Sequence, residues 1–389
     1  MPEKQIFSDY GLIGDNLELK KNIIIEINKE GKIRKTSSQK IENSANIAKN
    51  KPTYLLIPGF INSHIHIGDS FAKEEGFNKN LIDIVAPPNG LKHKLLKSTP
   101  EKIRREGISK ASIEMISNGI SFFIDFRENG MNGINLLRGA LKGSPINYLA
   151  LGRYNDINEA ELVYNAADGF GFASYRHLTS RIKEKLKEFK KSKKKIFACH
   201  DAEYVRDEKV FEELINDKLI DVIIHGTHYI KEDLIKIKKK NIALVLCPRC
   251  NGYFGVGFPP INEIIDLNIP ISLGTDNVMV NNLDLFEEMR YTYRLHRVLR
   301  RNTNSTLITA KDLLKMITIN AAKNFGLESE IGSISEEKYA DFFMIDLNNP
   351  NLYVYKVDNE NIYPLIVQRT KSENIKRMFI RGELIFERR

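Results

Sequence analysis

Histidines at the ends of apolar runs are the first residues in this sequence that could do chemistry. His64 and His66 stand two apart at the end of one such run, and alternate side chains of a strand point to the same face. His200, His225 and Asp276 each close a further apolar run. Imidazole nitrogens with a carboxylate suit zinc or a similar divalent ion, and a catalytic site keeps one position for water. These five residues are therefore candidates for a metal centre.

The elements that must position these side chains are short apolar runs, which alternate with longer segments of helical period. The runs cover residues 55–66, 121–126, 147–153, 169–174, 196–201, 221–225, 242–248 and 269–276. Continuous apolar strands indicate burial on both faces, as in a parallel sheet covered by helices. Eight strand–helix repeats predict an α/β fold, a TIM-type (β/α)8 barrel. A lone strand-end histidine is usually a core residue, but five such positions on one barrel face favour a metal site.

The first loop of this barrel is long. A helix is expected from Glu101, after the capping sequence Ser98-Thr99-Pro100, to Ile116. Before it lies the insertion 68–97, on the face of the barrel where active sites are built. Loops of this length are usually functional or disordered, and the sequence leaves the role of this one open.

Both ends of the chain differ from the middle. Segments 1–55 and 336–389 contain short strands and tight turns, such as 22–27 with the turn 29–32 and 377–380 with the turn 381–383. Each is too short to bury a core alone, so they are expected to pair into one small β-sandwich. The predicted domains are therefore 1–55 and 336–389 for the sandwich and 56–335 for the barrel.

Composition excludes several classes of protein. The chain has 389 residues, 42% hydrophobic, with a net charge of +9, which indicates a globular core. The basic runs 183–195 and 231–240 contain helix-spaced apolar residues and no interleaved aromatic residues, so a nucleic-acid partner is not expected. No apolar stretch reaches the ~20 residues of a membrane span, and three cysteines allow no disulfide framework. A cytoplasmic protein without a membrane partner is predicted.

The order of short motifs resembles the amidohydrolase superfamily, specifically its branch of cytosine, guanine and adenosine-type deaminases and chlorohydrolases. The motifs are Pro58-Gly59-Phe60 before the His-x-His pair, His200-Asp201-Ala202-Glu203, His225-Gly226-Thr227-His228, Cys247-Pro248-Arg249-Cys250-Asn251, Leu273-Gly274-Thr275-Asp276, and Gly332-Ser333-Ile334 with Tyr339-Ala340-Asp341. Each motif alone is weak, but their order is specific and spans almost the whole chain.

The resemblance implies roles for individual residues. His64, His66, His200 and Asp276 would bind one divalent metal, with zinc expected first and iron as the alternative, and strand four has no lysine to bridge a second ion. His225 would contact a metal-bound hydroxide, which adds to a ring carbon. Asp276 and His225 would then move its proton toward the departing ammonia, while Glu203 would protonate the adjacent ring nitrogen of the substrate.

Residues for substrate binding are less readable. The candidates follow strands or lie in the first loop: His93, Arg127 with its neighbour Glu128, Arg153, His228 and Arg249. Arginines at the mouth would suit a carboxylate or phosphate on the substrate, and structural ion pairs are an equal alternative for each.

The expected activity is deamination of an N-heterocyclic small molecule: a purine, pyrimidine, pterin or nucleoside derivative. Two alternatives stay open, a cyclic-amide hydrolase resembling imidazolonepropionase and a non-catalytic scaffold that kept the barrel. The sequence does not define the oligomeric state, although members of the superfamily often form dimers or larger homo-oligomers.

Overall fold

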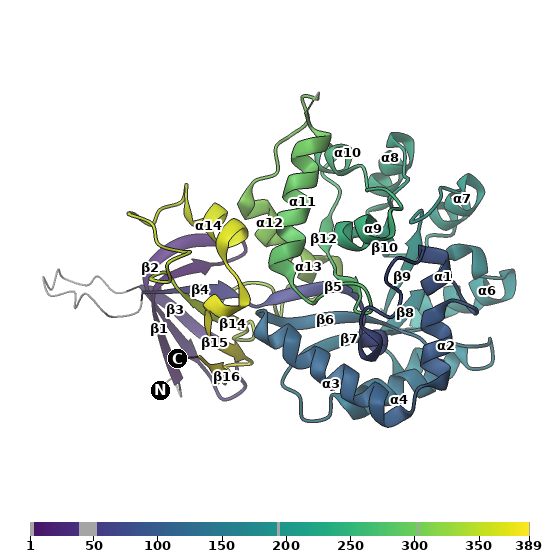
Figure 1. The fold of residues 1–389 in the computed structure, drawn as a ribbon, viewed down its shortest axis with the longest axis horizontal. Helices are drawn as coiled ribbons and strands as arrows, with labels where there is room; N and C mark the ends of the chain where they lie inside the picture. The colour runs from purple at the N-terminus through teal and green to yellow at the C-terminus, as the bar shows by residue number, and fades with distance from the viewer. Residues whose placement is uncertain (1–3, 39–52, 193–194, 302, 389) are drawn as a thin grey trace, which may run out of the picture.

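The computed structural model describes residues 4–38, 53–192, 195–301 and 303–388. Two parts lie side by side (Figure 1): a sheet built from both ends of the chain, in purple and yellow, and a barrel built from its middle. The chain ends both lie on the side of the terminal sheet. The expectation that the termini pair into one small domain is confirmed.

The barrel strands are parallel neighbours in the order of a closed (β/α)8 barrel. They are β5 (Phe60–His66), β6 (Ile120–Arg127), β7 (Asn147–Gly152), β8 (Gly169–Phe172), β9 (Ile196–Asp201), β10 (Val222–His225), β11 (Ala243–Leu246), β12 (Ile271–Leu273) and β13 (Asp276–Asn277). The last barrel strand is divided: β12 pairs with β11, and β13 pairs with β5. The two ends of the sheet meet in this way, and the predicted barrel is confirmed.

One predicted strand is wrong. The apolar run 55–66 forms two strands in different sheets, β4 (Tyr54–Pro58) in the terminal sheet and β5 in the barrel. The backbone turns from one sheet to the other at Gly59, whose N–H donates to the carbonyl of Asp341. Hydrophobicity reports burial and not the identity of the sheet, which is why the run looked continuous. We propose Gly59 as the junction between the domains, in place of the predicted boundary at residue 55.

Helices cover the outside of the barrel. They are α3 (Glu101–Ser117), α4 (Gly130–Ala140), α5 (Ala160–Ala166), α6 (Ser180–Ser192), α7 (Glu208–Asp217), α8 (Lys231–Lys240), α10 (Ile261–Asp266) and α11 (Leu285–Leu299), followed by α12 (Ala310–Met316) and α13 (Ile319–Asn324). In the basic helices the predicted apolar stripes are buried, with Leu186 and Leu234 fully inaccessible. The burial of one apolar stripe in each helix agrees with the predicted solvated amphipathic helices.

Among the described residues the terminal sheet has seven strands, and it packs over a core of its own. Besides β4 it contains β1 (Lys4–Ile13), β2 (Glu18–Ile27), β3 (Ile33–Ser38), β14 (Phe342–Asp346), β15 (Ile375–Ile380) and β16 (Glu383–Glu387). The turns at its two ends meet, because Gly31 and Gly382 both form backbone hydrogen bonds to Ala340. The helix α14 (Ile362–Arg369) packs against α11 and α12 of the barrel and so joins the two parts.

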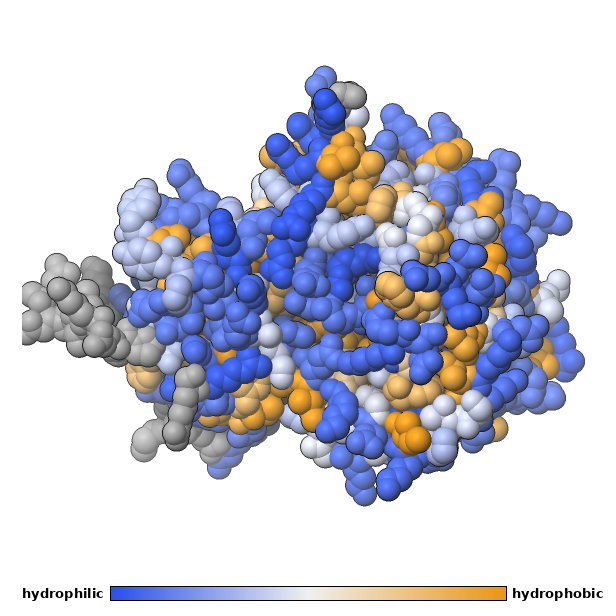
Figure 2. All heavy atoms as spheres, in the orientation of Figure 1, coloured by the Kyte–Doolittle hydropathy of each residue, from blue (hydrophilic) through white to orange (hydrophobic). Residues whose placement is uncertain are grey.

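The first loop of the barrel is ordered into short helices over its mouth. It contains the 3-10 turn η1 (Ile67–Ala72), α1 (Leu81–Val85) and α2 (Leu91–Ser98). The face seen in Figure 2 is mostly hydrophilic, with hydrophobic residues scattered over it. Within the described part of the chain, every helix is too short or too polar to cross a membrane.

Candidate metal and catalytic site

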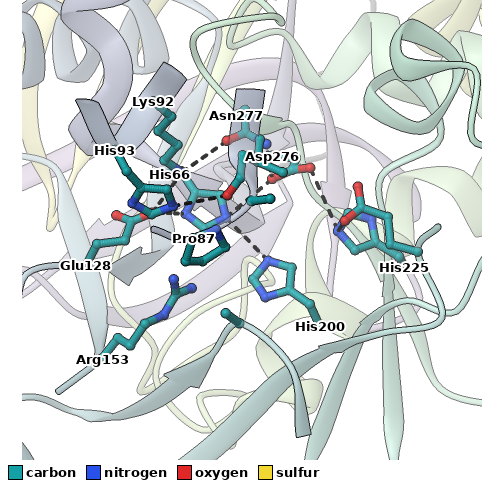
Figure 3. A pocket seen from close by; sticks show the side chains of 14 residues that line it. His66, Pro87, Lys92, His93, Glu128, Arg153, His200, His225, Asp276 and Asn277 are labelled. Atoms are coloured by element: carbon teal, nitrogen blue, oxygen red, sulfur yellow. Dashed lines mark hydrogen bonds and ion pairs between the residues drawn. The ribbon is translucent and has the colours of Figure 1, made fainter. Parts of the chain in front are cut away.

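The candidate site lies at the carboxyl ends of the barrel strands, where ring nitrogens and carboxylate oxygens converge (Figure 3). Nε2 of His64 lies 3.2 Å from Nε2 of His200 and 3.1 Å from Oδ1 of Asp276. Nε2 of His66 lies 3.3 Å from that of His200 and 3.6 Å from the same Asp276 oxygen. The barrel thus brings the four predicted ligands together from β5, β9 and β13.

These separations fit a tetrahedral metal site. With metal–ligand distances of about 2.1 Å, neighbouring donor atoms of a tetrahedron lie about 3.4 Å apart. The four separations above run from 3.1 to 3.6 Å. Nε2 of His225 lies 3.8 Å from Oδ2 of Asp276, and donor atoms of His64, His200, His225 and Asp276 all lie within 4.8 Å of one another. The donor set therefore fits one divalent ion with His225 beside it.

The remaining ring nitrogens of two candidate ligands have partners that orient them. Nδ1 of His66 lies 2.9 Å from Oε1 of Glu128, and Nδ1 of His200 lies 2.9 Å from the carbonyl oxygen of Phe172. Burial, followed by the charge of Lys92, lowers the pKa of His66 to about 3. Burial and the neighbouring imidazoles hold the pKa of His200 well below its usual value. Both rings are neutral at pH 7, the form that binds a metal.

The backbone around two site residues is strained. His225 has a φ of 74° and Asp276 a φ of 61°, a left-handed conformation that is costly for residues other than glycine. Just before Asp276 the chain passes very close to β5: a Cβ at Gly274 would lie 2.7 Å from both the Cβ and the backbone nitrogen of His64. Such strain persists only where the surrounding fold enforces it, and it clusters at functional sites.

Glu203 lies next to His225, at the bend that follows β9. The backbone bends just after β9, at Ala202 with a φ of 49°, and Oε2 of Glu203 comes to 3.5 Å from Nε2 of His225. Burial, reinforced by the negative charge of Asp276, raises the pKa of Glu203 well above its usual value. The carboxyl group therefore holds its proton more firmly than an exposed glutamate and could donate it to a substrate.

A partly open cavity lies above these residues. The first loop forms one of its walls with Val85, Ala86 and Pro87. His93 and Arg153, two of the predicted substrate contacts, also line it. Nε2 of His93 lies 3.0 Å from the carbonyl oxygen of Val85. The loop 68–97, whose role the sequence left open, thus closes the cavity over the candidate metal site.

Three other predicted substrate contacts do not line this cavity. Arg127 is 1% exposed and lies beneath the site, where it forms ion pairs with Asp125 and Glu128 at 3.3 and 2.7 Å. Its strand position was correct, but buried carboxylates hold the guanidinium. Within the described chain, the structure assigns it to ion pairing rather than to the mouth.

Arg249 and His228 are likewise outside the set of cavity-lining residues. Arg249 donates to the carbonyl oxygen of Asp284 at 3.1 Å and lies 3.7 Å from Glu288, so α9 (Pro248–Phe254) is tied to the start of α11. Nε2 of His228 is buried without a hydrogen-bond partner among the described residues. Neither side chain lines the cavity above the candidate metal site, and their role in substrate binding stays a prediction.

Lys92 lines the cavity and was missed by the sequence reasoning. It is 3% exposed, and its ammonium lies 2.7 Å from Oε1 of Glu128. The only local signal is its position beside His93 in the long first loop. A lysine in a basic, exposed-looking segment gives no indication of burial, since its acidic partners are distant in the sequence.

The barrel and the cluster at its strand ends define the class, a (β/α)8 enzyme with a group of side chains that could hold a metal ion. The sequence model of the amidohydrolase family matches residues 55–385. The chain therefore belongs to the amidohydrolase family, as its motifs had indicated, and it is a hydrolase that acts on carbon–nitrogen bonds.

Individual relatives agree with this assignment. An uncharacterized protein of Methanocaldococcus jannaschii is 35% identical over 94% of this chain and 94% of its own length. A 5-methylthioadenosine/S-adenosylhomocysteine deaminase of Thermoanaerobacter pseudethanolicus is 26% identical over 86% of this chain and 82% of that enzyme. Among solved structures, an adenosine deaminase from Xanthomonas campestris with bound zinc has a TM-score of 0.81 at 14% identity, covering 98% of this chain and 92% of that one. This last likeness supports the fold alone.

Proposed function

We propose that this protein is a metal-dependent aminohydrolase that deaminates an N-heterocyclic small molecule with release of ammonia. The observation that supports it most strongly is the cluster of four donor atoms at 3.1 to 3.6 Å, next to Glu203, a half-buried glutamate whose pKa is raised. A metal site without a proton donor would suit many hydrolases. A metal site beside a proton donor such as Glu203 favours attack on a ring carbon next to a basic nitrogen.

The residues proposed to hold the metal are His64, His66, His200 and Asp276. Zinc is proposed first, because three imidazoles and one carboxylate are common zinc ligands, and iron suits the same set. A bound divalent ion would supply a water molecule of lowered pKa as the nucleophile.

Three side chains of the cavity would handle the protons. Asp276 has one carboxylate oxygen toward the histidines and the other 3.8 Å from Nε2 of His225, so it is placed to accept a proton from the nucleophile. His225 would hold the attacking oxygen in position through the same nitrogen. Glu203, whose pKa is raised by desolvation and by the charge of Asp276, would donate a proton to the ring nitrogen of the substrate and so make the adjacent carbon electrophilic.

Arg153, which lines the same cavity as Asp276, His225 and Glu203, is proposed to orient the substrate. Its Nε donates to the carbonyl oxygen of Gly171 at 3.3 Å, and within the described part of the chain no carboxylate forms an ion pair with its guanidinium. Figure 3 shows the guanidinium directed toward the cavity. Its remaining N–H groups are thus available to a polar or anionic group of the substrate. His93 is proposed as a second contact.

The test is ammonia release from a panel of purines, pyrimidines, pterins and nucleosides, with the zinc-loaded protein. Adenosine derivatives modified at the 5′ position come first, because the deaminase relative is named for two such compounds. Ammonia from at least one substrate, lost on chelation and restored by metal, is the expected result. Ring opening of a cyclic amide without ammonia would instead identify a cyclic-amide hydrolase. Zinc-loaded protein inactive on every compound would contradict deamination of these classes.

A further inference from the structure

The buried ammonium of Lys92 connects the first loop to the floor of the site. Nζ lies 2.7 Å from Oε1 of Glu128, 3.1 Å from Oδ1 of Asn277 and 3.4 Å from Oδ2 of Asp69. These partners stand on three other segments: Glu128 directly after β6, Asn277 in β13 and Asp69 in η1. A single side chain of α2 therefore joins four parts of the barrel mouth; Figure 3 shows Lys92 with Glu128 and Asn277.

Two of these partners contact proposed metal ligands directly. Oε1 of Glu128, the oxygen nearest to Lys92, also lies 2.9 Å from Nδ1 of His66. Asn277 donates from Nδ2 to Oδ1 of Asp276 at 3.1 Å, while its own Oδ1 accepts from Lys92. The ammonium is thus one contact away from a ligand on β5 and from a ligand on β13. These two strands close the barrel.

Lys92 does not have the environment of a substrate-binding cation. An ammonium has three hydrogens, and three protein oxygens already lie within 3.4 Å of Nζ. Arg153, on the other wall of the same cavity, donates one hydrogen bond, from Nε to Gly171, and its other guanidinium N–H groups have no ion-pair partner among the described residues. The two cations that line the cavity therefore differ in their partners: Lys92 binds groups of the protein, whereas Arg153 has N–H groups free for a substrate.

We propose that Lys92 is a positioning residue of the metal centre, which holds Glu128 and Asn277 so that His66 and Asp276 present their donor atoms to the ion. The inference rests on the proposed metal site but not on the identity of the substrate. Groups that orient metal ligands usually contribute 10–100-fold to metal affinity. A consequence is that the first loop contributes to metal binding as well as covering the cavity.

The test compares zinc affinity of the purified metal-free protein and its variants, measured by competition with a chromophoric chelator. Lys92→Met keeps the length of the side chain and removes the ammonium, and it is expected to weaken zinc binding about 10–100-fold. The matched control is Lys94→Met on the same helix, an exposed lysine, which is expected to leave the affinity unchanged. Lys92→Arg, which keeps the charge, is expected to recover part of the loss.

A double-mutant cycle separates positioning from general destabilisation. If Lys92 acts through Glu128, the losses in zinc affinity from Lys92→Met and Glu128→Gln are less than additive in the double variant. Additive losses, or a loss below threefold in folded Lys92→Met protein, would overturn the proposal. If Lys92→Met does not fold, Asn277→Leu is the deciding variant, because it removes the hydrogen bond to Asp276 without removing a charge. A loss of zinc affinity of tenfold or more in this variant supports the proposal, and a smaller loss overturns it. No substrate is needed, so a failed deamination panel leaves this result standing.

Discussion

Gly274→Ala would test how tightly the fold sets the metal site. The new Cβ would lie 2.7 Å from the backbone nitrogen of His64, whereas ordinary contact begins at 3.4 Å. The difference, 3.4 − 2.7 = 0.7 Å, must be absorbed by the last barrel strand moving away from β5. The three obstructing atoms of His64 are its Cβ, backbone nitrogen and carbonyl oxygen, so a change of rotamer gives no relief.

The consequence for the site follows from the same geometry. Asp276 stands two residues after Gly274, and its Oδ1 is 3.1 Å from Nε2 of His64. A displacement of roughly 0.7 Å would exceed the ~0.2 Å within which metal–ligand distances vary. We expect zinc affinity to fall by at least about 100-fold, beyond the 10–100-fold typical of supporting residues, and stability to fall by about 1–3 kcal/mol.

The assay is zinc competition titration beside urea unfolding of the metal-free protein. The control is Gly143→Ala: no atom lies within 4 Å of the new Cβ there, but its φ of +82° makes alanine strained. It should cost about 1–2 kcal/mol of stability and leave zinc affinity untouched. Stoichiometric zinc binding by Gly274→Ala at the affinity of the unaltered protein would refute the reasoning.

Three further predictions concern single side chains. Glu203→Gln keeps the shape of the residue but removes its proton, so kcat should fall about 10²–10⁴-fold with zinc affinity unchanged; undiminished kcat would contradict its role. Arg153→Met should raise KM for the substrate about 10–100-fold, the value of a hydrogen bond to a charged group, and an unaltered KM would remove Arg153 from the binding site. Burial raises the pKa of Asp341 to about 6, so the folded state favours the protonated carboxyl group. The stability that this protonation contributes is lost as the pH rises through 6. The free energy of unfolding of Asp341→Asn, relative to that of the unaltered protein, should therefore rise by up to about 3 kcal/mol between pH 4 and pH 8. Urea titrations in which this difference is the same at pH 4 and pH 8 would contradict the prediction.

The metal cluster could be read from the sequence because its signal is local. Each of His64, His200, His225 and Asp276 stands at the end of an apolar run, and parallel strands of a barrel bring their carboxyl ends to one face. Side-chain alternation within a strand then places His66 beside His64. The geometry of one repeated unit was enough to predict that these side chains converge. Glu203, in contrast, was predicted from the resemblance to the amidohydrolase superfamily.

Positions that depend on distant partners were not readable. Arg127 and Arg249 stand just where a barrel strand ends, as predicted, yet acidic groups of their surroundings hold both guanidinium groups away from the cavity. Lys92 looked like one more lysine of a basic loop, and its hydrogen-bond partner Asn277 is 185 residues away. The role of a charged side chain can be assigned only when its ion-pair and hydrogen-bond partners are known.

Composition, periodicity and strand-end residues were sufficient to predict the barrel and the convergence of the candidate donor atoms, because these follow from local backbone geometry repeated along the chain. The pairing of the termini was predicted on another ground, that neither end could bury a core alone. Folding in three dimensions was needed to split the run 55–66 between two sheets, to make the loop 68–97 a wall of the cavity and to bury Lys92 against Glu128 and Asn277. Those features result from packing between segments far apart in sequence, and no local pattern encodes which segments meet.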